Sequence, residues 1–127
     1  MQIYLKILIF IALFLIIFSF LMFYMSIRPM KIITNFVPSD LGLKYEEVTF
    51  KGTDGIKLSG WFLPNNKSKA TIIVMHGYPA DKANLLGIAE FLAKDFNVFL
   101  FDFRSFGQSE GKYTTAGYLE KNDLLGA

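Results

Sequence analysis

The chain of 127 residues contains no cysteine and only one histidine, His76. The lack of cysteine excludes disulfides, thiol catalysis and cysteine-based zinc sites. A single histidine without cysteine leaves no convincing zinc site of another kind. Lysine and arginine number 13 against 11 acidic residues, and the net charge is +2. With the charges so nearly balanced, no basic patch predicts binding to nucleic acid.

Charged residues are also absent from positions 7–27, where two serines are the only strongly polar side chains. A helix of about 20 apolar residues spans the hydrocarbon core of a bilayer. A cleaved signal peptide is the alternative, but its apolar stretch normally has about 7–15 residues. Met25-Ser26-Ile27-Arg28 is moreover a poor cleavage site. We therefore expect residues 1–27 to be an uncleaved signal anchor, a single transmembrane helix that contacts the lipid membrane through residues 7–27.

The flanking charges leave the orientation of this anchor close to balanced. Lys6 and the N-terminal amine lie before it, and Arg28 and Lys31 follow it. The positive-inside comparison is therefore nearly a tie. Because so short an N-terminal tail is easily moved or retained, we expect the domain on the extracytoplasmic side by a narrow margin.

After the anchor, residues 28–43 have the features of a linker, because their two prolines discourage a continuous helix. We expect one α/β domain over residues 44–127. It begins with two alternating runs around Gly52-Thr53-Asp54-Gly55, which is a good hairpin signal.

Two continuous apolar runs, residues 71–75 and 97–101, predict strands that are covered on both faces, as in a parallel sheet. Between them a helix is expected from a cap at Asp81 to about Asp95. Its apolar positions follow helical spacing, at Leu85, Ile88, Ala89, Leu92 and Phe96. A last helix is expected after a cap at Thr114 or Thr115.

Two motifs carry the chemistry. His76-Gly77-Tyr78 follows the first buried strand, and Asp102-Phe103-Arg104-Ser105-Phe106-Gly107-Gln108-Ser109-Glu110-Gly111 follows the second. Together with the strand order, they resemble the front part of an α/β-hydrolase, closest to membrane-anchored serine esterases or serine aminopeptidase-like hydrolases. The resemblance implies that His76 and Gly77 open the oxyanion loop and that the backbone N–H of Tyr78 is an oxyanion-hole donor. The alternative is an ordinary strand-to-helix turn with a structural histidine.

The second motif departs from the family pattern at Ser105, where glycine is usual. We expect its charged residues, Asp102 and Arg104, to form a pair that braces the loop. It also contains Gly-x-Ser-x-Gly around Ser109, the pattern of a nucleophile elbow. An elbow must follow a strand directly and open a helix directly, whereas here loop sequence lies on both sides. Ser109 is therefore a poor candidate nucleophile, and the resemblance implies that the true elbow comes one helix and one strand later.

These patterns predict an α/β fold: a transmembrane helix, then the first strands and helices of an α/β-hydrolase, incomplete at the C-terminus. The resemblance implies hydrolysis of an ester or amide without a cofactor. Because nucleophile, acid and base are all missing, we expect the chain to be inactive alone. Two alternatives stay open. The chain is a non-catalytic, membrane-tethered module that pairs with a complementing C-terminal hydrolase chain, or it is a gene remnant.

Overall fold

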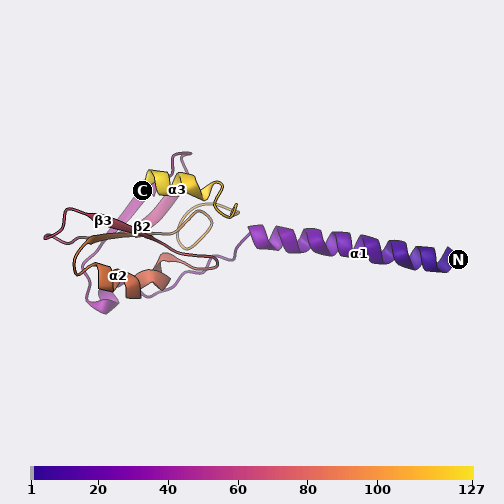
Figure 1. The fold of residues 1–127 in the computed structure, drawn as a ribbon, viewed down its shortest axis with the longest axis horizontal. Helices are drawn as coiled ribbons and strands as arrows, with labels where there is room; N and C mark the ends of the chain where they lie inside the picture. Colours follow the sequence, from indigo (N-terminus) through magenta and orange to yellow (C-terminus); the bar gives the residue numbers. More distant parts are fainter. Residues whose placement is uncertain (1) are drawn as a thin grey trace.

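A long N-terminal helix leads into a mixed α/β domain in the computed structural model, which describes residues 2–127 (Figure 1). Two short 3₁₀ turns, η1 and η2, lie in the connecting segments. In chain order the elements are α1 (Gln2–Ile27), η1 (Pro38–Leu41), β1 (Glu46–Lys51), β2 (Lys57–Leu63), β3 (Thr71–Met75), η2 (Lys82–Leu85), α2 (Leu86–Leu92), β4 (Asn97–Phe101) and α3 (Glu120–Gly126).

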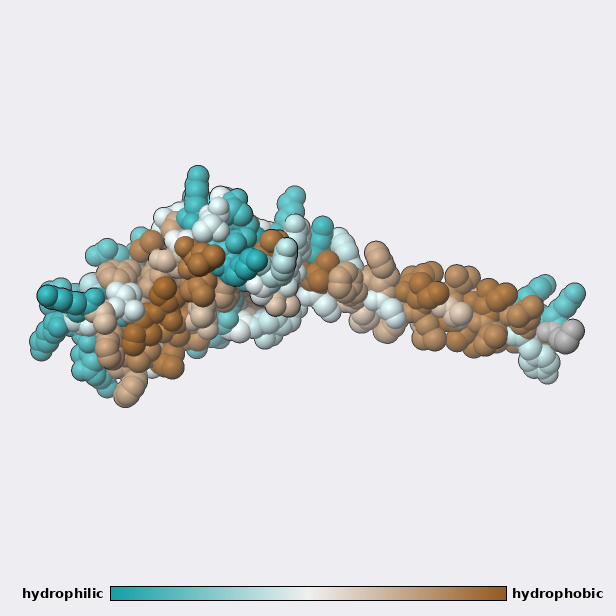
Figure 2. Space-filling model, turned by 45° about the horizontal axis from the view of Figure 1, so that its top comes forward, coloured by the Kyte–Doolittle hydropathy of each residue, from teal (hydrophilic) through white to brown (hydrophobic). Residues whose placement is uncertain are grey.

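Helix α1 projects away from the domain (Figure 1), and the face of it seen in Figure 2 is mostly apolar, with hydrophilic residues at its N-terminal end. None of its residues is buried against the rest of the chain. By length and composition, this helix is a candidate membrane span.

The sheet has the strand order β1-β2-β4-β3. β1 and β2 form the expected antiparallel hairpin, in which Glu46 lies opposite Phe62 and Lys51 opposite Lys57. β3 and β4 run parallel, as the two apolar runs predicted, with Thr71 opposite Asn97. The other neighbour of β4 is the antiparallel strand β2. The result is a mixed sheet whose parallel strands lie at one side.

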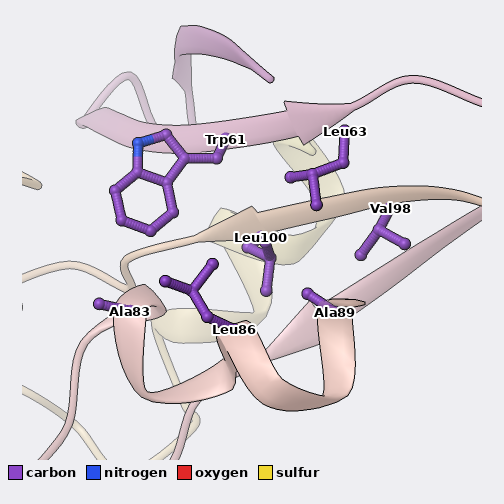
Figure 3. Packing of buried hydrophobic residues seen from close by; sticks show 7 residues of the cluster. All are labelled: Trp61, Leu63, Ala83, Leu86, Ala89, Val98 and Leu100. Atoms are coloured by element: carbon purple, nitrogen blue, oxygen red, sulfur yellow. The ribbon is translucent and has the colours of Figure 1, made fainter. Parts of the chain in front are cut away.

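Helix α2 covers one face of this sheet and closes the main apolar core (Figure 3). The predicted helical stripe is only partly correct. Leu86 and Ala89 point into the core, whereas Ile88 is 52% exposed and Phe96 lies at the surface. The α-helix also ends at Leu92, three residues before the expected end. The buried residues of this core are Trp61, Leu63, Ala83, Leu86, Ala89, Val98 and Leu100.

The opposite face is covered only in part, by α3 at the β1 end (Figure 1). Over the rest of this face lies an open groove of about 400 Å³, lined mainly by apolar side chains. The outer edge of β3 pairs with no other strand within residues 2–127. Among the groove's lining residues are Val48, Phe62, Ile73 and Phe99.

The segment between α1 and the domain is fixed by polar contacts. The Thr34 N–H donates to Asp81 Oδ2 at 2.7 Å, and the Lys31 ammonium donates to the carbonyl of Ser109. Asp81 Oδ1 accepts from the Ala83 N–H at 3.1 Å, which confirms the predicted cap at the start of η2. These contacts hold the end of α1 against the domain.

Candidate functional site

A cavity of about 790 Å³ opens where the parallel strands β3 and β4 end. Ligands of open α/β sheets bind at the carboxyl ends of the strands, so this is the position that the fold favours for a site. We call it the junction cavity, because α1 and the domain line it together. Its lining residues are Phe23, Ser26, Ile27, His76, Gly77, Tyr78, Phe103, Phe106, Tyr113, Thr114, Thr115, Ala116, Gly117 and Glu120.

The imidazole of His76 is buried at the floor of this region, and both ring nitrogens are engaged. Nε2 accepts a hydrogen bond from the Phe103 N–H at 3.1 Å. Nε2 therefore carries no proton, and Nδ1 donates to the Gly77 carbonyl at 2.8 Å. The rings of Phe103 and Phe106 pack edge-on against the imidazole. His76 thus joins the loop after β3 to the loop after β4, and neither nitrogen is free to act as a base.

Tyr78 lies at the rim of the junction cavity, with its side chain 59% exposed. Its hydroxyl donates to the carbonyl of Ser26 at 3.4 Å, and its ring packs against Phe106. Within residues 2–127 the backbone N–H of Tyr78 donates no hydrogen bond. The donor that the resemblance implies for the oxyanion hole is therefore uncommitted.

Ser109 lies apart from this cavity and is buried. Its hydroxyl donates to the Asp102 carbonyl at 2.5 Å and accepts from the Ser59 N–H at 3.0 Å. The hydroxyl is thereby committed to linking the loop after β4 to strand β2. No helix opens at Ser109, since the chain continues as turns and loop to α3.

The predicted pair of Asp102 with Arg104 is wrong, because each side chain binds a different partner. Asp102 accepts from the Lys82 ammonium at 2.6 Å and from the Gln108 N–H at 2.9 Å. Arg104 donates to Asp123 at 2.6 Å and pairs with Asp54 at 2.8 Å. The loop is braced, but by η2 on one side and by α3 and the hairpin on the other.

The contact between Arg104 and Asp54 alters the ionisation of both side chains. Burial opposes the charge of Arg104, but hydrogen bonds to Asp123 and Asp54 outweigh it and raise the pKa of the guanidinium. The hydrogen bond from Arg104 in turn lowers the pKa of Asp54. Arg104 and Asp54 therefore stay charged at neutral pH.

Ser105, which replaces the usual glycine, has a left-handed backbone with φ of 70°. Glycine is favoured in this conformation, because other L-residues bring their Cβ too close to the backbone. The Ser105 hydroxyl donates to the Tyr113 carbonyl at 2.8 Å, which offsets part of the cost. The loop thus has a left-handed residue at this position without glycine. Within residues 2–127, no group of three or more histidine or acidic side chains is placed to hold a metal ion.

Comparison with curated proteins finds several relatives, although no protein-family model matches. The chain is 38% identical over 81 residues to the uncharacterized protein YfhR of Escherichia coli K12. This match covers 59% of the chain and 28% of YfhR. The uncharacterized membrane protein YNL320W of Saccharomyces cerevisiae is 28% identical over 82 residues, which cover 63% of the chain and 29% of that protein. The chain therefore spans less than a third of the length of these relatives.

Solved structures give a closer likeness. The esterase Pf2001 of Pyrococcus furiosus matches with a TM-score of 0.72 and 39% identity, over 79% of this chain and 39% of the esterase. The fold is α/β-hydrolase-like. The α/β hydrolase GrgF from a Penicillium species matches with a TM-score of 0.50 and 30% identity, over 54% of the chain and 25% of that enzyme.

The hydrolase-like fold also places residues that sequence reasoning missed. Glu120, at the start of α3, lines the junction cavity and binds the loop before it. Its carboxylate accepts from Thr115 N–H at 2.9 Å, and from the hydroxyls of Thr114 and Thr115 at 2.7 Å. Burial opposes its ionisation, but these bonds outweigh burial and lower its pKa to about 2. Such a carboxylate is a weak base and a strong anchor for the cavity wall.

Lys82 and Asp123 were also missed, although both are buried and form the two bracing pairs. Lys82 gave no sequence signal, because a lysine beside a helix cap is usually solvent-exposed. Asp123 lies in a polar stretch of the last helix. The expected cap of the last helix at Thr114 or Thr115 is wrong, because α3 begins at Glu120 and its first turn has no side-chain cap. Thr115 instead accepts from the Leu119 N–H at 2.7 Å in the turn before the helix.

Proposed function

We propose that residues 1–127 are the N-terminal portion of a membrane-anchored serine hydrolase that acts on an ester or amide. The observation that carries this proposal is the His76-Gly77-Tyr78 turn, which lies beside a large cavity at the ends of parallel strands. The likeness to the Pf2001 esterase supports the same chemistry. In this proposal α1 is the anchor, and the domain lies on the extracytoplasmic side.

The proposed contribution of this portion to catalysis is electrostatic. An uncommitted backbone N–H can stabilise the negative oxygen that develops when a carbonyl is attacked. Tyr78 supplies such a donor, and His76 fixes the loop that carries it. One oxyanion donor is worth about 2.7–4 kcal/mol in the transition state.

Residues 1–127 on their own are proposed to have negligible hydrolase activity. An acyl-enzyme mechanism needs a hydroxyl with a base in hydrogen-bonding reach. The hydroxyl of Ser109 and both nitrogens of His76 are already bonded to other groups. Neither residue can take the roles of nucleophile and base in this arrangement.

A second candidate function, a non-catalytic module that pairs with another polypeptide, is favoured by the open edge of β3. An unpaired, apolar edge strand is a template for pairing with another chain. β3 carries Ile72, Ile73 and Val74, and beside it lies the open groove of the sheet. In an α/β-hydrolase, the occupant of that edge would be the strand that leads to the nucleophile. Both candidate functions therefore call for the same kind of partner, a polypeptide that adds a strand to the open edge of β3.

The test is hydrolysis of a short-chain p-nitrophenyl ester by the purified chain, alone and co-expressed with the polypeptide encoded directly downstream. The expected result is no turnover alone and turnover by the complex. Activity of the chain alone that is lost in Ser109→Ala would overturn the assignment. A complex without esterase or amidase activity would favour the non-catalytic module. A downstream sequence lacking any Gly-x-Ser-x-Gly after a strand would favour a gene remnant.

The oxyanion role can be tested in the active complex with two substitutions at one position. Tyr78→Pro removes the backbone N–H, whereas Tyr78→Phe keeps it and removes only the hydroxyl. We expect kcat to fall by about 10²–10³ in Tyr78→Pro and to stay within about twofold in Tyr78→Phe. Equal effects of both substitutions would exclude the N–H as the donor.

Protease accessibility of residues 44–127 in intact cells and spheroplasts tests the proposed side of the membrane.

A further inference from the structure

The junction cavity is built from two sources, the domain and the end of the apolar helix. Phe23, Ser26 and Ile27 of α1 form one wall, and Tyr78, Phe106 and Tyr113 are part of the other. Its volume of about 790 Å³ lies within the usual range of small-molecule sites, about 300–1,000 Å³. A site for a water-borne substrate needs no wall contributed by a membrane helix.

The helix end is bonded to the domain at the cavity itself. The Thr114 N–H donates to the Ile27 carbonyl at 2.8 Å, and the Tyr78 hydroxyl donates to the Ser26 carbonyl. The Lys31 ammonium adds a third link a few residues further along. α1 therefore contacts the cavity through a defined set of bonds, and the cavity lies at the depth where α1 ends.

That depth is the membrane interface, if α1 spans a bilayer as proposed above. Tyr24 lies in the last turns of α1, with the guanidinium of Arg28 4.7 Å from its ring centroid. Tyrosine and arginine are the residues that typically mark the ends of spanning helices. Two further exposed tyrosines, Tyr78 and Tyr113, line the cavity.

We propose that the junction cavity binds the acyl chain of a bilayer lipid, which enters from the membrane along the C-terminal turns of α1. The apolar wall of Phe23, Ile27 and Phe106 fits a hydrocarbon chain. The lipid carbonyl lies towards the Tyr78 N–H, where the hydrolase would act on it. The substrate class is therefore an acyl ester or amide of a membrane lipid. This inference rests on the proposed function, because it uses both the anchor and the oxyanion donor.

The experiment uses the whole 127-residue chain in phospholipid nanodiscs that contain a phospholipid with a photoreactive diazirine in its acyl chain. After illumination, mass spectrometry locates the labelled residues. Labels on Tyr78, Phe106 or Tyr113, besides those on α1, are expected. Labels confined to α1 would overturn the proposal. In a second arm, a water-soluble six-carbon diazirine is added to unlabelled nanodiscs, and cavity labelling by this probe alone would also overturn membrane entry.

A matched pair of substitutions on one helical turn sharpens the test. Ser26→Trp places a large ring in the cavity wall but keeps the carbonyl that Tyr78 binds, and Met25→Trp places the same ring outside the cavity. We expect Ser26→Trp to lower labelling of the domain about tenfold, as for an over-packing cost near 1.4 kcal/mol. Met25→Trp is expected to leave labelling within twofold of the wild type. Equal effects of the two would overturn the assignment.

This readout does not depend on hydrolysis. If the complex with a downstream chain fails to turn over any ester while the cavity is labelled, the hydrolase proposal fails and the lipid site stands. If the complex hydrolyses a short ester while labels stay on α1, the lipid site fails and the hydrolase proposal stands. The wild-type labelling map decides the question even if Ser26→Trp does not fold.

Discussion

The two faces of the sheet differ in how completely this chain covers them. On the α2 face, Trp61, Leu63 and Leu100 are buried and packed against the helix (Figure 3). On the other face, Phe62 and Ile73 line an open groove, and α3 covers only one end. The apolar residues of α2 thus bury this face of the sheet. On the other face, apolar side chains stay accessible in the groove.

The largest expected effect comes from the charged part of the α2 face. Lys82→Ala leaves the buried carboxylate of Asp102 without its ammonium partner. Loss of one member of a buried pair costs about 3–5 kcal/mol. Urea unfolding of the chain in detergent, followed by the fluorescence of Trp61, measures this cost. Lys67→Ala, at an exposed lysine, is the control and should change stability by less than about 0.5 kcal/mol. Similar values for both variants would show that the pair is not stabilising.

The comparison of the two faces is tested directly by one truncation on each. Leu100→Ala creates a cavity in the packed core, and we expect a loss of about 2–5 kcal/mol. Phe62→Ala removes a half-buried ring from the open groove, and we expect about 1–2 kcal/mol. The same unfolding experiment measures both. A larger loss for Phe62→Ala would mean that a second layer already covers the open face in solution.

Glu120 gives the α3 side a pH-dependent contribution. Its pKa in the folded chain, about 2, lies below the ordinary value of 4.5. The stability that it contributes is therefore fully present above about pH 4.5 and is lost as the pH falls towards about 2. Glu120→Gln should cost about 1–3 kcal/mol at pH 7 and should show less further loss in acid. If Glu120→Gln lost stability with falling pH as steeply as the wild type, the pH dependence would belong to other carboxylates.

The smallest effect is expected in the loop after β4. Ser105→Gly relieves the left-handed backbone but removes the hydrogen bond to Tyr113, so stability should change by less than about 1 kcal/mol. Ser105→Ala loses the bond and keeps the strain, and should be less stable than the glycine variant. Thermal unfolding of the two variants gives their order. If the alanine variant were more stable than the glycine variant, the left-handed backbone at position 105 would not be strained.

Local patterns predicted the strands well, and they predicted side-chain partners poorly. β3 and β4 occupy the two apolar runs to the residue, because a continuous apolar run between polar loops has few other ways to be buried. Of the predicted stripe, Leu85, Ala89 and Leu92 pack at the core. Ile88 and Phe96 do not, since the chain starts as a 3₁₀ turn, which rotates the positions that follow, and α2 ends at Leu92. The charged partners of Asp102 and Arg104 lie about 20 residues away or more along the chain. No local spacing encodes such pairs.

The candidate site shows the same division. The His76-Gly77-Tyr78 turn and its position after a buried strand were evident in the sequence. The assignment of Tyr78 as an oxyanion donor stays a prediction, and so does the dismissal of Ser109 as nucleophile. The structure adds that His76 is held by Phe103 and Gly77 and that Ser109 is bonded to Asp102 and Ser59.

The sequence by itself determined the apolar helix, the hairpin and the two parallel strands, because each depends on residues that are neighbours along the chain. Only the tertiary structure decided which charges pair, where Glu120 and Lys82 are buried, and that the end of α1 forms a wall of the junction cavity. Those features depend on contacts between segments far apart in sequence, and these contacts exist only after the sheet and its helices have packed together.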